Sequence, residues 1–335
     1  MKWFYTFLII VLVFSCTKVE IEPLLFFDLM EIPEGFPNIV EPDDNHFSKK
    51  RWALGKKLFF DPIMSSDSTV SCASCHAPNL AFSDKVALSL GVKDRIGTQN
   101  APTLVNLAYH PYYTSAGGVP TLEMQTLVPI QEHNEFDFNI LYIVERLKNN
   151  STYVQMSNDA YSKTPDAFVI TRSLANFERS LISGYSRYDQ FENYNKNTLT
   201  KSERRGMDLF FNKKTNCSSC HSGFNFTNYA FENNGLYKKY TNEGRFRLTQ
   251  IDTDQALFKV PTLRNIELTA PYMHDGSFEN LEEVIEHYNT GGKNHPNKSE
   301  LIQPLDLSNK EKRDLIAFLK SLTDESFIQN SLFQN

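Results

Sequence analysis

Two copies of the pattern Cys-x-x-Cys-His carry the chemistry of this chain of 335 residues, one copy in each half. They consist of Cys72, Cys75 and His76, and of Cys217, Cys220 and His221. In this pattern two thiols bind one haem through thioether bonds, and the adjoining histidine becomes the proximal ligand of the iron. Thioredoxin-like pairs and zinc sites also use Cys-x-x-Cys, but zinc ribbons separate their two pairs by roughly 15–20 residues. The much wider separation here predicts two covalently attached c-type haems.

The first sixteen residues predict export. Lys2 precedes an apolar run over residues 3–14 that is too short to span a membrane. The run ends in Ser15 and Cys16, which is typical of a bacterial lipobox whose cysteine is lipidated and becomes the first mature residue. An ordinary signal peptide with an incidental cysteine is the alternative. Because every other cysteine belongs to a haem motif, we expect a signal peptide over residues 1–16 and a lipoprotein that faces the periplasm.

The remaining composition limits the partners of the chain. No second long apolar run follows Cys16, so the membrane is expected to be reached through the lipid anchor only. The formal net charge is −6 and no basic run occurs, which argues against nucleic acid as a partner. The mild negative charge favours a basic electron-donating protein. The mature length of about 310 residues suits two domains.

The chain also repeats itself around the two motifs. GKKLFF at residues 55–60 precedes the first motif, and GMDLFF at residues 206–211 precedes the second. Each marks the end of a helix, the first expected to start near Ser48 and the second at a capping box of Thr200 and Glu203. Each half then closes with an apolar helical pattern, and Ser308 caps the second one. We therefore predict a mostly α fold with long loops, a linker over residues 185–197 and a boundary near Asn193.

Several longer stretches resemble the bacterial dihaem cytochrome c peroxidases and their relative MauG. They are LGKKLFFDP at residues 54–62, VSCASCH at 70–76, NAPT at 100–103, VPTLRN at 260–265 and APYMHDG at 270–276. The resemblance covers residues 51–322 and implies two cytochrome c-like domains packed face to face, each around one haem. The expected organisation is a tether over residues 17–45, an N-terminal peroxidatic domain over 46–192 and a C-terminal electron-transfer domain over 193–325.

The first haem is expected to keep an open iron position. Many members of the family close it with a distal histidine, but that position is Val92 here, and no histidine lies between His76 and His110. The resemblance implies a distal pocket of three residues in the family's spacing, namely Gln125, Pro129 and Glu135. Glu135 is the expected general acid and base, and Gln125 is expected to hold water or peroxide. His133 is an alternative base, and a solvated charged turn is the alternative reading of Glu135.

The second haem needs a sixth ligand from downstream of His221. Asn280 caps a predicted helix whose apolar stripe includes Tyr288, so a plain core tyrosine is one interpretation. The resemblance instead places the axial ligand at Tyr288, where peroxidases carry methionine and MauG carries tyrosine. A phenolate favours ferric iron and lowers the potential, whereas methionine raises it. Met273 is the alternative ligand, and His274 is expected to be structural.

Two departures from the family and one metal site remain. The family's tryptophan between the haems falls on residues 115–117, Ser-Ala-Gly, so that Tyr112 or Tyr113 is left as a substitute. MauG's surface tryptophan near its second motif falls on Thr215, which weakens the case for protein-radical chemistry.

The resemblance also implies one calcium ion between the haems, held by oxygen atoms. The matching positions are Asn100, Thr269 and Pro271.

The most specific interpretation is a dihaem peroxidase. Hydrogen peroxide is expected to be reduced to water at the N-terminal haem, with electrons from a small donor, a cytochrome c or a copper protein, relayed through the C-terminal haem. One alternative is MauG-like oxidation of a protein or organic substrate. The other is an electron carrier without turnover, although a carrier has no need of an open iron.

Overall fold

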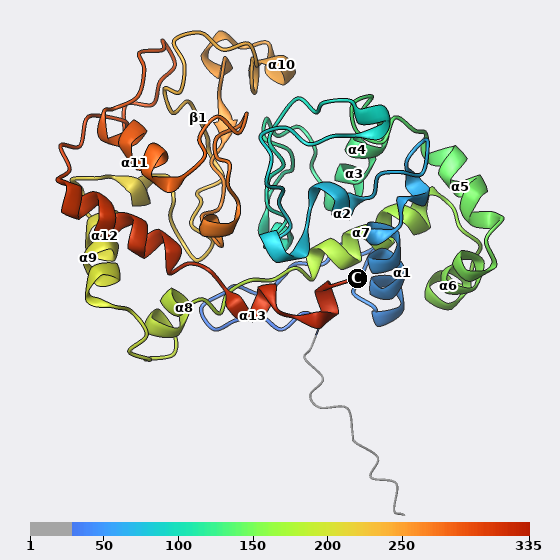
Figure 1. Ribbon diagram of the computed structural model, residues 1–335. Coiled ribbons are helices and arrows are strands. Elements are labelled where there is room, and N and C mark those ends of the chain that lie inside the picture. The colour runs from blue at the N-terminus through green and yellow to red at the C-terminus, as the bar shows by residue number, and fades with distance from the viewer. Residues whose placement is uncertain (1–28) are drawn as a thin grey trace, which may run out of the picture.

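The computed structural model describes residues 29–335 as two helical lobes that lie side by side (Figure 1). The N-terminal half forms one lobe, and most of the C-terminal half forms the other. This confirms the predicted fold class. The predicted signal peptide and Cys16 lie outside the described residues. Within residues 29–335 no helix has the length and apolar character needed to cross a membrane.

Helices make up most of the regular structure. Those of the N-terminal half are α1 (Lys49–Phe60), α2 (Cys72–Cys75), α3 (Leu122–Gln125), α4 (Leu127–Gln131), α5 (Ile140–Lys148), α6 (Ser151–Tyr161) and α7 (Ala167–Arg179). Those that follow are α8 (Arg187–Glu192), α9 (Lys201–Phe210), α10 (Phe246–Thr249), α11 (Leu281–Asn289), α12 (Asn309–Lys320) and α13 (Glu325–Ile328). The described sheet has two antiparallel strands, β1 (Phe231–Glu232) and β2 (Phe258–Lys259).

The predicted helix starts are confirmed. α1 begins after Ser48, and the predicted capping boxes are present at Thr200 for α9 and at Ser308 for α12. In each box the cap hydroxyl accepts from the third helical N–H, while the third side chain accepts from the cap N–H. Asn280 caps α11 by accepting from the Glu283 N–H at 2.9 Å. Local sequence is sufficient for α9, α11 and α12 because each cap partner lies within one turn. Ser48 makes no side-chain cap bond, and its N–H donates to Asn176 Oδ1 on α7 at 3.1 Å.

A helix crossing forms the centre of each lobe. In the N-terminal lobe α1 packs on α7 at Gly55, where an added Cβ would lie 1.8 Å from the carbonyl oxygen of Ser173. In the C-terminal lobe α9 packs on α12 at Gly206, where it would lie 1.9 Å from the carbonyl oxygen of Asp314. Only glycine permits this approach of helix backbones. The repeated glycines therefore mark one crossing made twice.

The predicted linker is partly helical and tightly held. α8 lies inside residues 185–197, and Asp189 on it forms a buried ion pair with Arg264 at 2.8 Å. The segment predicted as the linker thus contains a helix that a partner distant in the sequence holds in place. The domain boundary near Asn193 stays a prediction.

Both ends of the described chain pack against the lobes. Residues 29–45 include Asn45, which is buried and donates from Nδ2 to Glu123 Oε1 at 2.6 Å. At the other end, Phe327 and Phe333 enter the core of the N-terminal lobe (Figure 1). We call residues 324–335 the C-terminal strap. Through it, the last residues of the chain stabilise the lobe formed by the first half.

Candidate haem sites

The attachment residues lie in equivalent positions in the two lobes. Cys72 and Cys75 bound the short helix α2, and Cys217 and Cys220 bound a 3-10 turn. All four thiols are free and partly exposed. Burial raises the pKa of Cys75 and of Cys220 to about 11, so neither is poised as a thiolate at neutral pH. Inert, paired thiols next to a histidine fit thioether attachment.

Each proximal histidine is held by one backbone carbonyl. His76 Nδ1 lies 2.9 Å from the carbonyl oxygen of Phe82, and His221 Nδ1 lies 3.1 Å from that of Phe226. Because a carbonyl only accepts, Nδ1 carries the proton in both rings and Nε2 keeps its lone pair for iron. Burial lowers the pKa of both imidazoles, which favours this neutral form. The residues present therefore fit two c-type haems.

The predicted distal residues of the first haem come from consecutive elements. Gln125 ends α3, Pro129 lies in α4, and Glu135 follows in the next turn. Val92, at the family's histidine position, is fully buried, and its N–H donates to the Glu135 carbonyl oxygen at 2.9 Å. The position that carries a ligand in other members thus anchors the backbone of the predicted acid and base.

The carboxyl of Glu135 has an altered acidity. Burial, with repulsion from Glu132 as the second cause, raises its pKa to about 7. The residue is nevertheless accessible, and its charge contributes to the raised pKa of Cys72 and of Cys75. An exposed carboxyl with a pKa of about 7 can exchange a proton with solvent or with a bound molecule near neutral pH.

His133, the alternative base, is engaged elsewhere. Its side chain is 69% exposed, and Nδ1 lies 3.1 Å from Asp137 Oδ1. Arg95 also contacts this ring nitrogen and bonds Asp137 at 2.7 Å. His133 therefore belongs to a surface ion-pair group, and Glu135 is the better candidate.

The two candidate ligands of the second haem meet at Asn234. Its Nδ2 lies 3.2 Å from Met273 Sδ, and a hydrogen bond from the same side chain acts on Tyr288. Burial raises the pKa of Tyr288 to about 12, and the charges of Cys217 and Cys220 contribute. The structure thus brings Tyr288 close to the attachment cysteines and does not separate it from Met273.

The neighbouring histidines have other contacts. His274 stacks on Phe258 with ring centroids 4.1 Å apart, which agrees with the structural role expected for it. His287 Nε2 lies 2.9 Å from the carbonyl oxygen of Asn234 and must donate to it. His274 follows Met273 directly in the sequence, and the His287 ring lies 5.2 Å from the Tyr288 ring, so both rings lie beside the candidate ligands.

The internal repeat relates the distal sides of the two haems. In the N-terminal half Tyr113 forms a β-bridge with Val119, and its hydroxyl donates to the Leu107 carbonyl oxygen. In the C-terminal half Tyr272 forms a β-bridge with Phe278, and its hydroxyl donates to the Ile266 carbonyl oxygen. Thr121 caps α3 and Asn280 caps α11, and each cap follows its tyrosine by the same number of residues. In this register Pro129 corresponds to Tyr288. Proline has no side-chain donor atom, so the two halves differ at the position that would close the iron.

The predicted calcium residues lie at the junction of the lobes. The Asn100 N–H donates to the His274 carbonyl oxygen at 3.0 Å, which ties Asn100 to the turn that follows Thr269 and Pro271. Its Nδ2 donates to Val86 and Ala87 carbonyls, so Oδ1 is the amide atom that remains for a cation. Among residues 29–335 no three His, Cys, Asp or Glu side chains gather as a metal site. An amide and two carbonyls fit calcium, but nothing tests the prediction.

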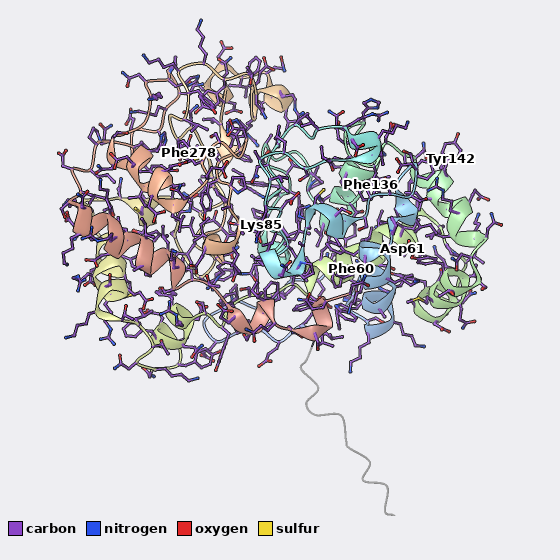
Figure 2. The ribbon with its side chains drawn as sticks, viewed as in Figure 1. Phe60, Asp61, Lys85, Phe136, Tyr142 and Phe278 are labelled. Atoms are coloured by element: carbon purple, nitrogen blue, oxygen red, sulfur yellow. The ribbon has the colours of Figure 1, made fainter. Side chains whose placement is uncertain are left out.

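A cavity of about 380 Å³ adjoins this junction. Lys85, Glu267 and Pro271 line it, and Lys85 lies on the side of the N-terminal lobe that faces the other lobe (Figure 2). Of the three predicted calcium residues only Pro271 lines this hollow, and calcium at the junction stays a prediction.

One buried acid was not predicted. Glu178 on α7 is 5% exposed, and its Oε2 has no hydrogen-bond partner among the described residues. Burial raises its pKa to about 8, and its charge is one cause of the raised pKa of Cys72. The only sequence signal was a charged residue directly after Phe177 of the apolar stripe, which is more typical of a solvent-facing position.

Comparisons with known proteins agree with this geometry. The family model for di-haem cytochrome c peroxidase matches residues 49–197, and that for cytochrome c matches residues 204–323. The chain is 35% identical to the methylamine utilization protein MauG of Methylorubrum extorquens, over 88% of this chain and 83% of that protein. It is 32% identical to the cytochrome-c peroxidase IdrP1 of a Pseudomonas strain, over 86% and 84%. A crystal structure of a MauG-like protein associated with microbial copper homeostasis has a TM-score of 0.86 and 34% identity, covering 90% of this chain and 97% of that one.

Proposed function

Because the chain belongs to the di-haem cytochrome c peroxidase family that includes MauG, we propose that it reduces hydrogen peroxide to water in its N-terminal half. Electrons enter through the haem of the C-terminal half. When bound, each haem supplies a redox-active iron, and an iron with a free position binds peroxide. Two electrons and two protons convert one peroxide into two waters.

The observation that carries this proposal is the difference between Pro129 and Tyr288. The two residues occupy one register of the internal repeat, and only tyrosine has an atom that binds iron. Val92 also stands where many members of the family carry the histidine that closes this iron. The first half is therefore the place where peroxide binds.

Glu135 moves the proton in this proposal. Its carboxylate accepts a proton from the bound peroxide and returns it to the leaving oxygen as the O–O bond breaks. A pKa of about 7 suits both directions of transfer near neutral pH. Gln125, at the end of α3, holds the peroxide or a water in line with this carboxylate.

The proposal is tested by mixing the purified dihaem protein with hydrogen peroxide and a reduced donor, such as a small cytochrome c, a copper protein or ascorbate. We expect donor oxidation in proportion to the peroxide added, and a resting ferric spectrum with one high-spin haem. A fully low-spin spectrum together with no donor oxidation and no spectral response to peroxide would remove the enzyme function and leave an electron carrier.

For the second haem we propose Tyr288 as the sixth ligand. Its place near Cys217 and Cys220 supports this, and Met273 is the competitor because both contact Asn234. We expect no near-infrared methionine–iron band in the ferric protein. A band that is lost in Met273→Ala and kept in Tyr288→Phe would assign Met273 instead.

A second candidate activity is oxidation of a protein or organic substrate. It is favoured by 35% identity to a MauG protein and by the tyrosine at the ligand register. Thr215 argues against surface electron capture of the MauG kind, because it is 5% exposed and its hydroxyl donates to the backbone of α9. Peroxide consumption that needs an organic substrate and ignores every reduced donor would favour this second activity.

The cell-envelope location and the calcium ion also remain proposals. Lipidation of Cys16 is tested by the mobility and membrane association of Cys16→Ala in the exporting cell. Calcium at Asn100, Thr269 and Pro271 is tested by metal analysis of the purified protein before and after chelation. We expect about one calcium per chain in the native protein and a loss in Asn100→Ala.

A further inference from the structure

Three aromatic rings cross the junction between the lobes in sequence. Tyr113 is 7% exposed and belongs to the core of the N-terminal lobe. The His110 ring lies parallel to Tyr113, with centroids 6.5 Å apart and 18° between planes. The other side of His110 meets the Tyr229 ring of the C-terminal lobe edge-on at 5.1 Å. The rings therefore make a continuous π contact from one lobe to the other.

Each end of this series lies next to a haem attachment site. Tyr229 follows the second motif, where the Asn228 N–H donates to the Cys220 carbonyl oxygen at 2.8 Å. At the other end, Tyr113 belongs to the core cluster of the N-terminal lobe against which Cys72 packs. The series thus runs between the surroundings of Cys72 and those of Cys220.

Lys259 fixes the middle ring. Its N–H donates to the Ser115 carbonyl oxygen at 2.7 Å across the junction, and its Nζ lies 3.1 Å from His110 Nδ1 and 3.3 Å from the Tyr112 carbonyl oxygen. An ammonium only donates, so Nδ1 accepts and the ring proton is on Nε2. Burial, with Lys259 as the second cause, holds the pKa of His110 well below its usual value. The ring is therefore neutral and fixed in orientation.

The equivalent crossing on the other side of the repeat carries no such series. There the Asn100 N–H donates to the His274 carbonyl, as Lys259 does to Ser115. The Asn100 side chain, however, bonds to Val86 and Ala87 of its own lobe. The two crossings thus share a backbone hydrogen bond between the lobes. The side chain at the first is the Asn100 amide, and the side chain at the second is Lys259, which contacts His110 of the ring series.

We propose that Tyr113, His110 and Tyr229 are the electron path between the two lobes, and that Lys259 is a positioning residue for His110. This rests on the proposed function, in which electrons pass from the C-terminal to the N-terminal haem. Each electron that the donor gives to the C-terminal haem leaves it for the N-terminal haem. The rings act as a tunnelling medium, so they are neither oxidised nor protonated in net, and no proton travels with the electron.

The path is tested on the dihaem protein without peroxide. A laser flash generates a one-electron reductant, a deazaflavin semiquinone, and the redistribution of that electron between high-spin and low-spin haem is followed at two wavelengths. In Tyr229→Leu and His110→Leu we expect the redistribution rate to fall about tenfold, equivalent to about 1.4 kcal/mol in the barrier. Tyr229→Phe keeps the ring and is expected to keep the wild-type rate. Lys259→Met is expected to lower the rate less than His110→Leu.

Tyr112→Leu is the matched control. Tyr112 lies in the same junction and stacks on Phe231 at 5.0 Å. Its hydroxyl donates to the Tyr229 carbonyl oxygen, so it contacts the backbone of the series while its ring stacks outside it. We expect the wild-type rate in this variant. Haem content and both equilibrium potentials, measured for every variant, must stay at wild-type values, because a merely structural role would change them.

Two results would overturn the path: wild-type redistribution in both Tyr229→Leu and His110→Leu, or slow redistribution in Tyr112→Leu alone. Peroxide turnover is measured separately on the wild-type protein. Its absence, with the flash results as expected, would remove the proposed function and leave the path in place.

Discussion

The two lobes share one arrangement of helices and differ in the residue at the distal position of the haem. Gly55 and Gly206 allow the same close helix crossing, and a backbone carbonyl holds each proximal histidine. On the distal side, however, Pro129 stands where the other lobe has Tyr288. A duplicated fold therefore fixes haem attachment twice, and in the proposed function single residues on short helices decide which iron reacts and which stores an electron.

The lobes also differ in what supports the proximal carbonyl. In the C-terminal lobe Phe226 packs against residues of that lobe, Phe210 and Phe318. In the N-terminal lobe Phe82 packs in the same way against Phe59 and Phe177, and it also contacts Phe327 and Phe333 of the C-terminal strap. The last residues of the chain thus add to the support of the proximal side of the proposed reactive haem.

The largest expected effect concerns the acid and base that only the N-terminal lobe has. Replacing Glu135 by glutamine removes proton transfer, and we expect peroxide turnover to fall by on the order of 10²–10⁴. Steady-state donor oxidation measures this. Glu132→Gln, a neighbouring carboxyl in the same turn, should retain most of the activity. Equal losses in the two variants would assign the effect to the turn and not to Glu135.

The next effect concerns the strap. Phe333 is 5% exposed in the N-terminal core, and Phe333→Ala should lower the free energy of unfolding by about 3–5 kcal/mol. Thermal or denaturant unfolding measures this, and the spectrum of the N-terminal haem should change while that of the C-terminal haem does not. Phe211→Ala, at a residue that is 46% exposed, should change stability by less than about 0.5 kcal/mol. A spectral change at both haems would contradict the lobe-specific role.

The glycine crossings test what the lobes share. Gly55→Ala and Gly206→Ala each place a Cβ within 2 Å of a carbonyl oxygen, and each should cost about 1–3 kcal/mol in the free energy of unfolding. Denaturant unfolding of both variants, with the exposed Lys50→Ala on α1 as control, measures the cost. A large loss for one glycine and none for the other would show that the two crossings are not equivalent.

The smallest effect is a pH dependence. The pKa of Glu135 is raised to about 7, and the carboxyl must be ionised to accept the peroxide proton. Activity should therefore be nearly full above this pKa and fall about tenfold per pH unit below it. In Glu132→Gln the repulsion is gone, so the acidic limb should move to lower pH. If the acidic side of the pH–activity profile does not move in Glu132→Gln, a group other than Glu135 determines the pH at which activity falls.

Local signals in the sequence predicted much of this molecule. The helix starts at Thr200 and Ser308 were predictable because each cap bonds within one turn. The buried ion pair of Asp189 on α8 was not predictable, since Arg264 comes from a distant segment. The same holds for Glu178, whose burial depends on how α7 packs.

The sequence by itself determined that two haems are attached, that the chain repeats and that Val92 stands at the family's histidine position, because covalent motifs and residue types need no fold to be recognised. Only the tertiary structure decided what surrounds these positions. It joined Val92 to Glu135, brought Met273 and Tyr288 to one asparagine, and placed His110 between rings of both lobes. Burial and distance, which set acidity and electronic contact, exist only after distant segments pack together.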